Sequence, residues 1–456
     1  MSCTQESPMK TRDDLIEAHN SIGFVGLLAD GSLDNLILDL NEVDNTADFF
    51  KPFRPLSREF AIFGDSRTAQ CHTVAATAFA TENYGYAFWA AQVGNGFCPT
   101  TNNFGVGGDT TAQMLARIST VVASPADIIL FMGGTNDRTG GMTVADTKRN
   151  ILAIVRRLQK AGKIVIVAND TPRFASKALT APQQLDHEAI RDWINIELSK
   201  ITPVADTYSH IVPADLHDDL HPNVKGAYKI GALGFGPVLA KYIRLGVDLP
   251  TEATDLWSAN NVTGSLTANP TMLGSVTQAT GSVNPIAGSL VATGFKGAGS
   301  SFTGLTTQWS KEVALFGESQ VIKFAGTPTT AGAYLAVSPT ATFTLANVSA
   351  GNVISLMCAY DLVGDGAGIL GVTAELLITK PVATVSTTIY YRDGDKYVDP
   401  HSMPAGTISG ALDTQRYTVD GTETAIVARI SVYFAQNVPQ NSSIKLRQFA
   451  VRKHVA

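Results

Sequence analysis

Two short polar motifs carry residue types that acyl transfer by serine requires. FGDSRTAQ places Ser66 directly after an apolar run, and LHDDLHPN places Asp218 three residues before His221. An acid at that spacing can hydrogen-bond the imidazole Nδ1 and leave Nε2 facing the serine hydroxyl. Taken alone, Ser66 is equally well explained as a helix cap. The motif therefore needs support from elsewhere in the chain.

Two further motifs can supply donors to a developing oxyanion. NFGVGGDTT, residues 103–111, is a glycine-rich turn in which Gly107 and Gly108 lack the Cβ that would keep a ligand from the backbone N–H groups. GGTND, residues 133–137, holds Asn136, whose amide is a neutral donor. A serine, a base, an acid and an oxyanion hole are thus all available in the chain.

The elements around these motifs predict an α/β fold. Near-continuous apolar runs at 60–64, 127–134 and 163–170 are typical of buried parallel strands, and amphipathic patterns at 143–162 and 182–198 are typical of helices. Such alternation predicts a parallel sheet covered by helices on both faces. Each polar motif falls where a strand should end, and ligands gather at the carboxyl ends of parallel strands.

The four motifs, in this order, resemble the SGNH or GDSL-type ester hydrolases over about residues 58–240. The resemblance implies a flavodoxin-like three-layer fold and the chemistry of a serine ester hydrolase without a metal or organic cofactor. It implies Ser66 as nucleophile, His221 as base and Asp218 as the acid that orients the imidazole. It also implies an oxyanion hole formed by Ser66 N–H, Gly108 N–H and Asn136 Nδ2.

Two features depart from the family pattern. Arg67 stands where the family often has Leu, and its cation either contacts a polar or anionic substrate group or pairs with a local acid, the interpretation we favour. We expect Gly107 to contact the substrate and Gly108 N–H to be the backbone donor. Because the two glycines are adjacent, an alignment shifted by one residue would change which of them is the donor. The close Asp218–His221 spacing and the absence of GxSxG distinguish the chain from α/β-hydrolases.

Several other polar residues compete for roles in the site. His217 is a second histidine beside the base, and Asp65 and Asp137 are carboxylates next to the motifs, which we expect to support neighbouring loops. His72 and His187 fall on predicted helices, so we expect them to be surface or core residues. The acidic cluster around 215–219 lacks the ligand pattern of an EF-hand, and we expect no metal there.

The chain changes character near residues 246–255. The first 250 residues hold 27 acidic and 22 basic side chains, whereas the last 206 hold 13 and 12 and are rich in Gly, Ser, Thr, Ala and Val. We therefore expect a hydrolase domain at 58–245 and a second domain at 251–456. Residues 1–57 fit neither pattern and are expected to form an arm or an assembly segment, which would allow a homo-oligomer.

The sequence of the second domain predicts an all-β, jelly-roll-like sandwich of two packed antiparallel sheets. Residues 373–380, 425–436 and 443–453 alternate or are strand-like, with Gly-rich turns between them. The pattern loosely resembles carbohydrate-binding jelly rolls. Five aromatic residues either stack on sugar rings or, as we favour, fill the core. They are Trp257, Trp309, Tyr390, Tyr391 and Tyr397.

Composition excludes several classes of protein. A net charge of −6 and a pI near 5.8 argue against nucleic acid as the main partner. No apolar run is long enough to span a membrane, and the first residues show no Sec signal peptide. This leaves a cytoplasmic, a released or a virion-associated protein. Cys71 and Cys98 either pair or, as we favour, are buried free thiols.

The sequence therefore predicts a hydrolase of short acyl esters, with O-acetyl groups on a polysaccharide as the expected substrate. One alternative is a phage-tail-like adhesion or receptor-binding protein whose hydrolase domain is accessory or inactive. A lipase or thioesterase is another alternative.

Overall fold

The structure is a computed structural model that describes most of the chain from residue 58 onward. The described ranges are 58–75, 78–82, 85–243, 249–278, 283–341, 345–364, 368–381, 384–390 and 405–454. They belong to one compact unit. The expected arm at 1–57 lies outside the described residues, and no helix within them is long and apolar enough to cross a membrane.

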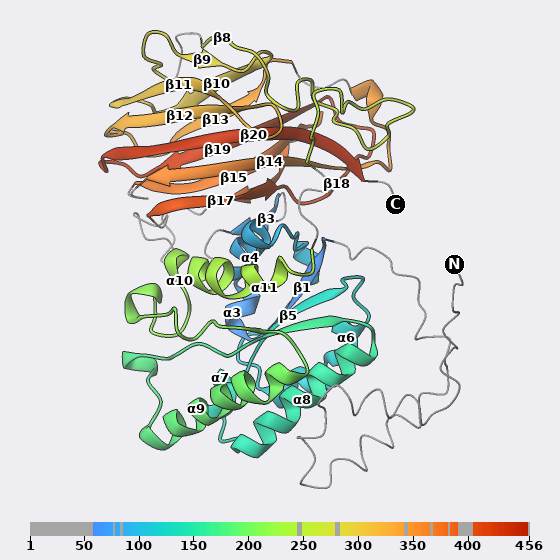
Figure 1. The fold of residues 1–456 in the computed structure, drawn as a ribbon, viewed down its shortest axis with the longest axis vertical. Helices are drawn as coiled ribbons and strands as arrows, with labels where there is room; N and C mark the ends of the chain where they lie inside the picture. Colours follow the sequence, from blue (N-terminus) through green and yellow to red (C-terminus); the bar gives the residue numbers. More distant parts are fainter. Residues whose placement is uncertain are drawn as a thin grey trace, which may run out of the picture. The chain divides into compact units, whose positions relative to one another are not determined.

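A five-stranded parallel sheet forms the first part of this unit (Figure 1). All of its strand pairs are parallel, as the buried apolar runs predicted. The strand order is β4 (Asn103–Gly105), β1 (Phe60–Gly64), β5 (Ile128–Met132), β6 (Ile164–Ala168) and β7 (Val204–Ala205).

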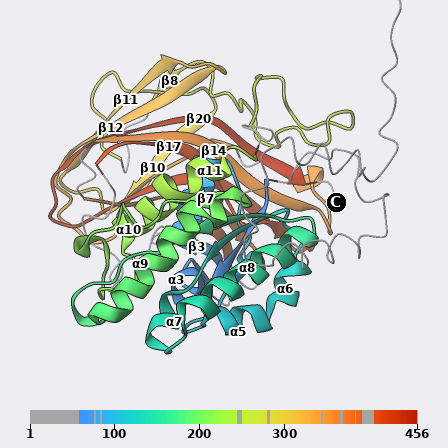
Figure 2. The ribbon, with the colours of Figure 1, turned by 60° about the horizontal axis from the view of Figure 1, so that its bottom comes forward.

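Helices cover both faces of this sheet, which confirms the α/β fold. Along β1, Phe60 and Ile62 join one apolar cluster, and Ala61 and Phe63 join another, because side chains alternate along a strand. The first cluster includes residues of α4 (Tyr86–Gly94) and α11 (Gly236–Leu239). The second includes α5 (Thr111–Ala116), α6 (Ile118–Val122), α8 (Val144–Lys160) and α9 (Ala181–Ile196), and Figure 2 shows the last two side by side.

Two largely antiparallel sheets form the second part and pack face to face as a sandwich (Figure 1). Inward residues of both sheets, such as Leu376 and Ile430 on one and Ile322 and Ile444 on the other, share one cluster. The larger sheet runs β10 (Phe295–Ser300), β13 (Ala333–Pro339), β19 (Ala425–Phe434), β15 (Ile369–Thr379), β16 (Thr384–Tyr390), β3 (Ala78–Glu82) and β2 (His72–Ala75). The smaller runs β11 (Leu305–Val313), β12 (Glu318–Gly326), β20 (Gln440–His454), β14 (Val353–Gly364) and β17 (Gly406–Asp413), and β18 (Tyr417–Thr418) pairs with β14.

A hairpin from the first part completes the larger sheet. Strands β2 and β3 pair antiparallel, and β3 pairs in parallel with β16, some 300 residues further along the chain. His72 therefore lies on a strand, and the expectation of a helix there is wrong. The segment is rich in Ala, which favours a helix locally, but pairing with β16 decides its conformation.

The two parts also share apolar core. Phe88 and Trp89 of α4 and Val224 of α10 (Val224–Tyr228) belong to the sandwich cluster. Trp89 contacts Tyr228 edge-on at a centroid distance of 5.2 Å. The expected domain boundary near 246–255 lies partly outside the described residues and stays a prediction.

Candidate active site

Ser66 lies on the turn from β1 into the short helix α3 (Ser66–Ala69). The cap of this helix is Asp65, whose Oδ1 accepts a hydrogen bond from Arg67 N at 3.0 Å. Because Asp65 performs the capping, the Ser66 hydroxyl remains available. Its Oγ lies 2.8 Å from His221 Nε2. The capping explanation of Ser66 is therefore wrong, and the side chain faces the expected base.

The loop before α10 holds His221 in place. Asp218 Oδ2 lies 2.8 Å from His221 Nδ1, and its Oδ1 accepts from His221 N at 2.7 Å. The loop closes where His217 N donates to His221 O at 3.0 Å, and the His217 and His221 rings stack with centroids 5.7 Å apart. Asn223 then caps α10 by accepting from Lys225 N and Gly226 N. One acid thus fixes both the backbone and the ring of His221.

Hydrogen bonding keeps Asp218 ionised. Partial burial opposes the charged form of Asp218, but the hydrogen bonds from the backbone and ring of His221 outweigh it and lower the pKa of Asp218 to about 2. An ionised carboxylate on Nδ1 leaves Nε2 as the nitrogen that accepts a proton from Ser66 Oγ. The geometry therefore suits proton abstraction from the serine.

The glycine-rich turn lies against the serine. A Cβ on Gly107 would lie 3.8 Å from Ser66 Cβ, and a Cβ on Gly108 would meet nothing within 4 Å. Gly108 has a φ of +83°, a conformation that other residues rarely adopt. Asn136 contacts the same glycine-rich turn, because its Nδ2 donates a hydrogen bond to Asp109 O at 3.0 Å. The structure thus brings the expected backbone and amide donors to one loop cluster beside Ser66.

A buried carboxylate ties these two loops together. Asp137 accepts from Thr111 N at 2.8 Å, from Thr111 Oγ1 at 2.5 Å and from Thr147 Oγ1 at 2.8 Å. It is fully buried. Asp137 is therefore a support for the loops that carry Gly108 and Asn136, as the sequence predicted.

The Arg67 side chain is fully buried, so the weaker expectation that Arg67 contacts the substrate is wrong. Its guanidinium has no exposed surface and pairs with Asp65 and Asp170, each at 2.5 Å. Burial disfavours the charged form, yet Asp170 and Asp65 outweigh it, so the pKa of Arg67 lies above its usual value. The favoured alternative, pairing with a local acid, is confirmed for Asp65.

Asp170 is the residue that sequence reasoning missed. It ends the β6 strand region, a position that could have drawn notice as the carboxyl end of a parallel strand. His187 Nδ1 lies 3.8 Å from its Oδ2. Burial lowers the pKa of His187 against the attraction of Asp170, so this histidine is a core residue of α9, as expected.

The described residues contain one set of side chains whose atoms lie close enough to share a metal ion. These are His217, Asp218 and His221, with ligand atoms within 4.8 Å of one another. Asp218 and His221 are already hydrogen-bonded to each other, and His221 is also hydrogen-bonded to Ser66. Cys71, Cys98 and Cys358 are buried free thiols, which confirms that expectation for the first two.

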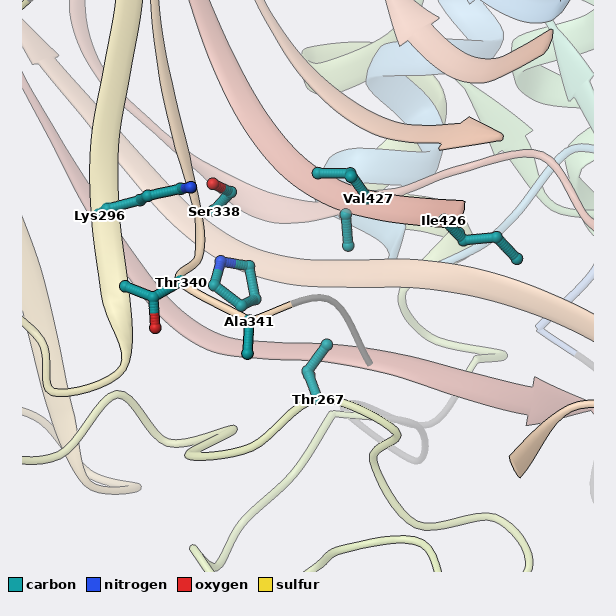
Figure 3. Close-up of a pocket in the computed structure, with 9 residues that line it drawn as sticks. Thr267, Lys296, Ser338, Thr340, Ala341, Ile426 and Val427 are labelled. Carbon is teal, nitrogen blue, oxygen red and sulfur yellow. The ribbon is translucent and has the colours of Figure 1, made fainter. Parts of the chain in front are cut away.

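Two hollows lie on the sandwich. The one in Figure 3 has a volume of about 70 Å³ and is lined by Lys296, Ser338 and Val427 among others, with the first two side chains pointing toward each other. It has room for only a few waters. A larger groove of about 510 Å³ crosses β11, β12, β14 and β20, and the one aromatic residue in its lining, Phe324, is buried. Neither hollow offers an aromatic platform for a sugar ring.

The five aromatic residues considered for sugar stacking differ in their burial and in whether the structure describes them. Trp309 is buried in the sandwich core, so the core interpretation holds for it. Trp257 packs partly buried against the same core, with Lys453 Nζ 4.4 Å from its ring centroid. Tyr391 and Tyr397 lie outside the described residues, as does the side chain of Tyr390. The likeness to carbohydrate-binding modules stays a prediction.

Comparison with known proteins finds a family match in the first part of the chain. Residues 62–229 match the model of the GDSL-like Lipase/Acylhydrolase family. This part of the chain is an SGNH/GDSL-type esterase or acylhydrolase domain, followed by the antiparallel sheets. No curated protein matches the chain at a significant level.

Among solved structures, three illustrate the likeness. A putative acylhydrolase from Bacteroides fragilis is 20% identical and covers 44% of this chain and 97% of its own, with a TM-score of 0.33. A catalytic mutant of an acetylxylan esterase from Geobacillus stearothermophilus is 19% identical over 42% and 99%, with a TM-score of 0.34. A carbohydrate esterase of family 3 from Talaromyces cellulolyticus is 19% identical over 40% and 96%, with a TM-score of 0.31.

Proposed function

We propose that this chain hydrolyses carboxylic esters of short acyl groups with Ser66 as the nucleophile. The observation that carries the proposal is the continuous hydrogen-bond chain from Ser66 Oγ through His221 to Asp218, with both links at 2.8 Å. A serine, a base and an orienting acid in this arrangement form the constellation that acyl transfer uses. The family match over 62–229 supports the same chemistry.

In the acylation step, His221 Nε2 takes the hydroxyl proton while Ser66 Oγ attacks the ester carbonyl carbon. The Asp218 carboxylate stabilises the imidazolium that forms. The tetrahedral oxyanion lies before Ser66 N–H, Gly108 N–H and Asn136 Nδ2. An amide nitrogen carries two hydrogens, so Asn136 can donate one to Asp109 O and the other to the oxyanion.

Collapse of the oxyanion expels the alcohol, which leaves with the proton from His221, and the acyl group stays on Ser66. His221 then takes a proton from a water molecule, whose oxygen attacks the acyl carbon. The second oxyanion collapses, the carboxylic acid leaves, and the proton returns to Ser66 Oγ. Every proton transfer uses the same Nε2 atom.

Replacing the nucleophile tests the proposal. We expect Ser66→Ala to lower kcat for p-nitrophenyl acetate by at least about 10³-fold, since loss of a triad serine removes the covalent route. A fluorophosphonate should label the wild-type chain at Ser66 and leave the variant unlabelled. Circular dichroism would establish that the variant folds. Turnover at the wild-type rate by a folded variant would overturn the assignment.

The acyl group and the alcohol are separate questions. We propose a short acyl group because no apolar lid segment is evident in the sequence, and O-acetyl groups on a polysaccharide because the strand pattern of the second part loosely resembles carbohydrate-binding jelly rolls. A series of p-nitrophenyl esters from acetate to palmitate should give the highest kcat/KM at two to four carbons, whereas a maximum at long chains would indicate a lipase. Release of acetate from acetylated polysaccharides, with the deacetylated polymers as controls, tests the alcohol.

A further inference from the structure

The two residues that flank the proposed nucleophile, Asp65 and Arg67, belong to a buried network of ion pairs. Arg67 Nε donates to Asp65 Oδ1 at 2.9 Å, and Nη2 donates to Asp65 Oδ2 at 2.5 Å. Asp65 Oδ1 also accepts the backbone Arg67 N at 3.0 Å. Both side chains have no exposed surface. Ser66 therefore sits between two residues that are locked to each other through three hydrogen bonds.

The same guanidinium ties this turn to a second strand. Arg67 Nη1 donates to Asp170 Oδ1 and to Thr171 Oγ1, each at 2.5 Å. Thr171 N also donates to Asp170 Oδ1 at 2.8 Å, and Thr207 Oγ1 donates to Asp170 O at 2.6 Å. These contacts link the ends of β1 and β6, two strands that are separated by β5 in the sheet.

The backbone at Asp170 is held in a rare conformation. Asp170 has a φ of +68°, which costs free energy for a residue other than glycine and persists only where surrounding contacts over-determine it. Residues in such conformations cluster at functional sites. The contact that Asp170 makes toward the proposed site is the one to Arg67. The constrained backbone at Asp170 therefore helps to hold the Arg67 guanidinium in one position.

The network uses the shape of arginine as well as its charge. Nε, Nη1 and Nη2 each have an acceptor, and a planar fork can bind two carboxylates in fixed directions, whereas a lysine ammonium is a point charge on a flexible stem. Removing the guanidinium would leave Asp65 and Asp170 buried together without their shared cation. His187 and Arg173 also lie close enough to interact electrostatically with Arg67 and Asp170, and Tyr86 is close enough to interact with Asp65.

We propose that Arg67 and Asp170 are positioning residues, which hold the turn at Ser66 so that its Oγ keeps the 2.8 Å contact with His221 Nε2. This role rests on the proposed function, in which Ser66 is the nucleophile. A positioning role predicts loss of the chemical step with little change in substrate affinity, because neither side chain is exposed to contact substrate.

Three variants test this role on the full chain with p-nitrophenyl acetate and a fluorophosphonate. We expect Arg67→Met to lower kcat and the phosphonylation rate of Ser66 by about 10²-fold, the effect of misplacing a reacting group by about 1 Å. KM should stay within about twofold, because ground-state binding is retained. Arg67→Lys should recover part of kcat, and Asp170→Asn should lose less than Arg67→Met, since an amide oxygen still accepts from Nη1.

The matched control is Arg429→Met in the sandwich, which removes an arginine bound to buried Glu375 at 2.5 Å. It should lower Tm like the Arg67 variants while kcat stays within about twofold of the wild type. If Arg67→Met does not fold, Arg67→Lys and Asp170→Asn decide the question. Wild-type kcat and phosphonylation rates in the folded variants would overturn the positioning role, as would a loss of kcat equal to that of the control.

The labelling experiment separates the two proposals. If the fluorophosphonate fails to label Ser66 in the wild-type chain, the proposed function fails and the positioning role fails with it. If the wild type is labelled and the Arg67 and Asp170 variants are labelled equally fast, only the positioning role fails.

Discussion

Buried charges are arranged differently at the carboxyl end of the parallel sheet and on the sandwich. Around Ser66, polar side chains from separate strand ends meet at one turn. Arg67, which follows β1, pairs there with its neighbour Asp65 and with Asp170, which follows β6. On the sandwich, some ion pairs join neighbouring strands, as the pair between Glu375 of β15 and Arg429 of β19 does. Convergence suits the reactive centre that we propose, whereas a pair between neighbouring strands supports the fold.

The difference follows from the topology of the two parts. In a parallel sheet all strands end at the same edge, so residues far apart in the chain meet there. In the antiparallel sandwich, successive strands end at opposite edges, and pairs such as Glu375–Arg429 form across neighbouring strands of one sheet. Variants in the two regions should therefore separate activity from stability.

Among the variants that contrast the two regions, the largest effect is expected at the oxyanion donors. We expect Asn136→Ala to lower kcat by about 10²–10³-fold, the range measured when one oxyanion donor is removed. KM should change little, because the lost interaction forms mainly in the transition state. Steady-state kinetics with p-nitrophenyl acetate measures the effect. A kcat within threefold of the wild type would remove Asn136 from the proposed hole.

A sandwich variant should show the opposite behaviour. Glu375 accepts from Thr373 Oγ1, Arg429 Nε and Tyr433 OH, and its carboxylate is 3% exposed. We expect Glu375→Gln to lower the free energy of unfolding by about 1–3 kcal/mol, since it weakens a buried charged hydrogen bond. Denaturant unfolding measures this loss, and kcat of the folded variant should equal that of the wild type. A clear loss of kcat would show that the two regions are coupled.

The smallest effect concerns the stability contributed by Asp218. Its pKa is lowered from 3.8 to about 2 in the folded chain, so its carboxylate stabilises the fold above about pH 4. That stabilisation is lost as the pH falls from about 4 through about 2, because the folded state must then bind the proton. The Tm difference between wild type and Asp218→Asn should shrink over this interval. A difference that is constant with pH would contradict the lowered pKa.

Local pattern was enough to predict much of the fold and the site. The apolar runs at 60–64 and 163–170 are strands, and the helix expected at 143–162 is α8, Val144–Lys160. Asp218 and His221 are three residues apart, so a single loop places them, and their spacing is visible in the sequence. The mutual contact with Ser66 follows because each motif ends a strand or precedes a helix at the same edge of the sheet.

Other features had no local signal. The Ala-rich segment around β2 and β3 favours a helix in isolation, and only its pairing with β16 makes it a hairpin. Arg67 looks like a cation beside a nucleophile, and the acid that completes its network lies 103 residues away. No periodicity or spacing connects positions at that separation.

The sequence by itself determined the reactive residue types, their order and the elements that carry them, because strand and helix periodicity and the short DxxH spacing are local properties. Only the tertiary structure decided what each charge does. In the structure, Asp65 caps α3, and Arg67 is buried between the carboxylates of Asp65 and Asp170. The physical reason is that a charge can be removed from water only where partners surround it, and one of the two carboxylates around Arg67, that of Asp170, comes from a distant part of the chain.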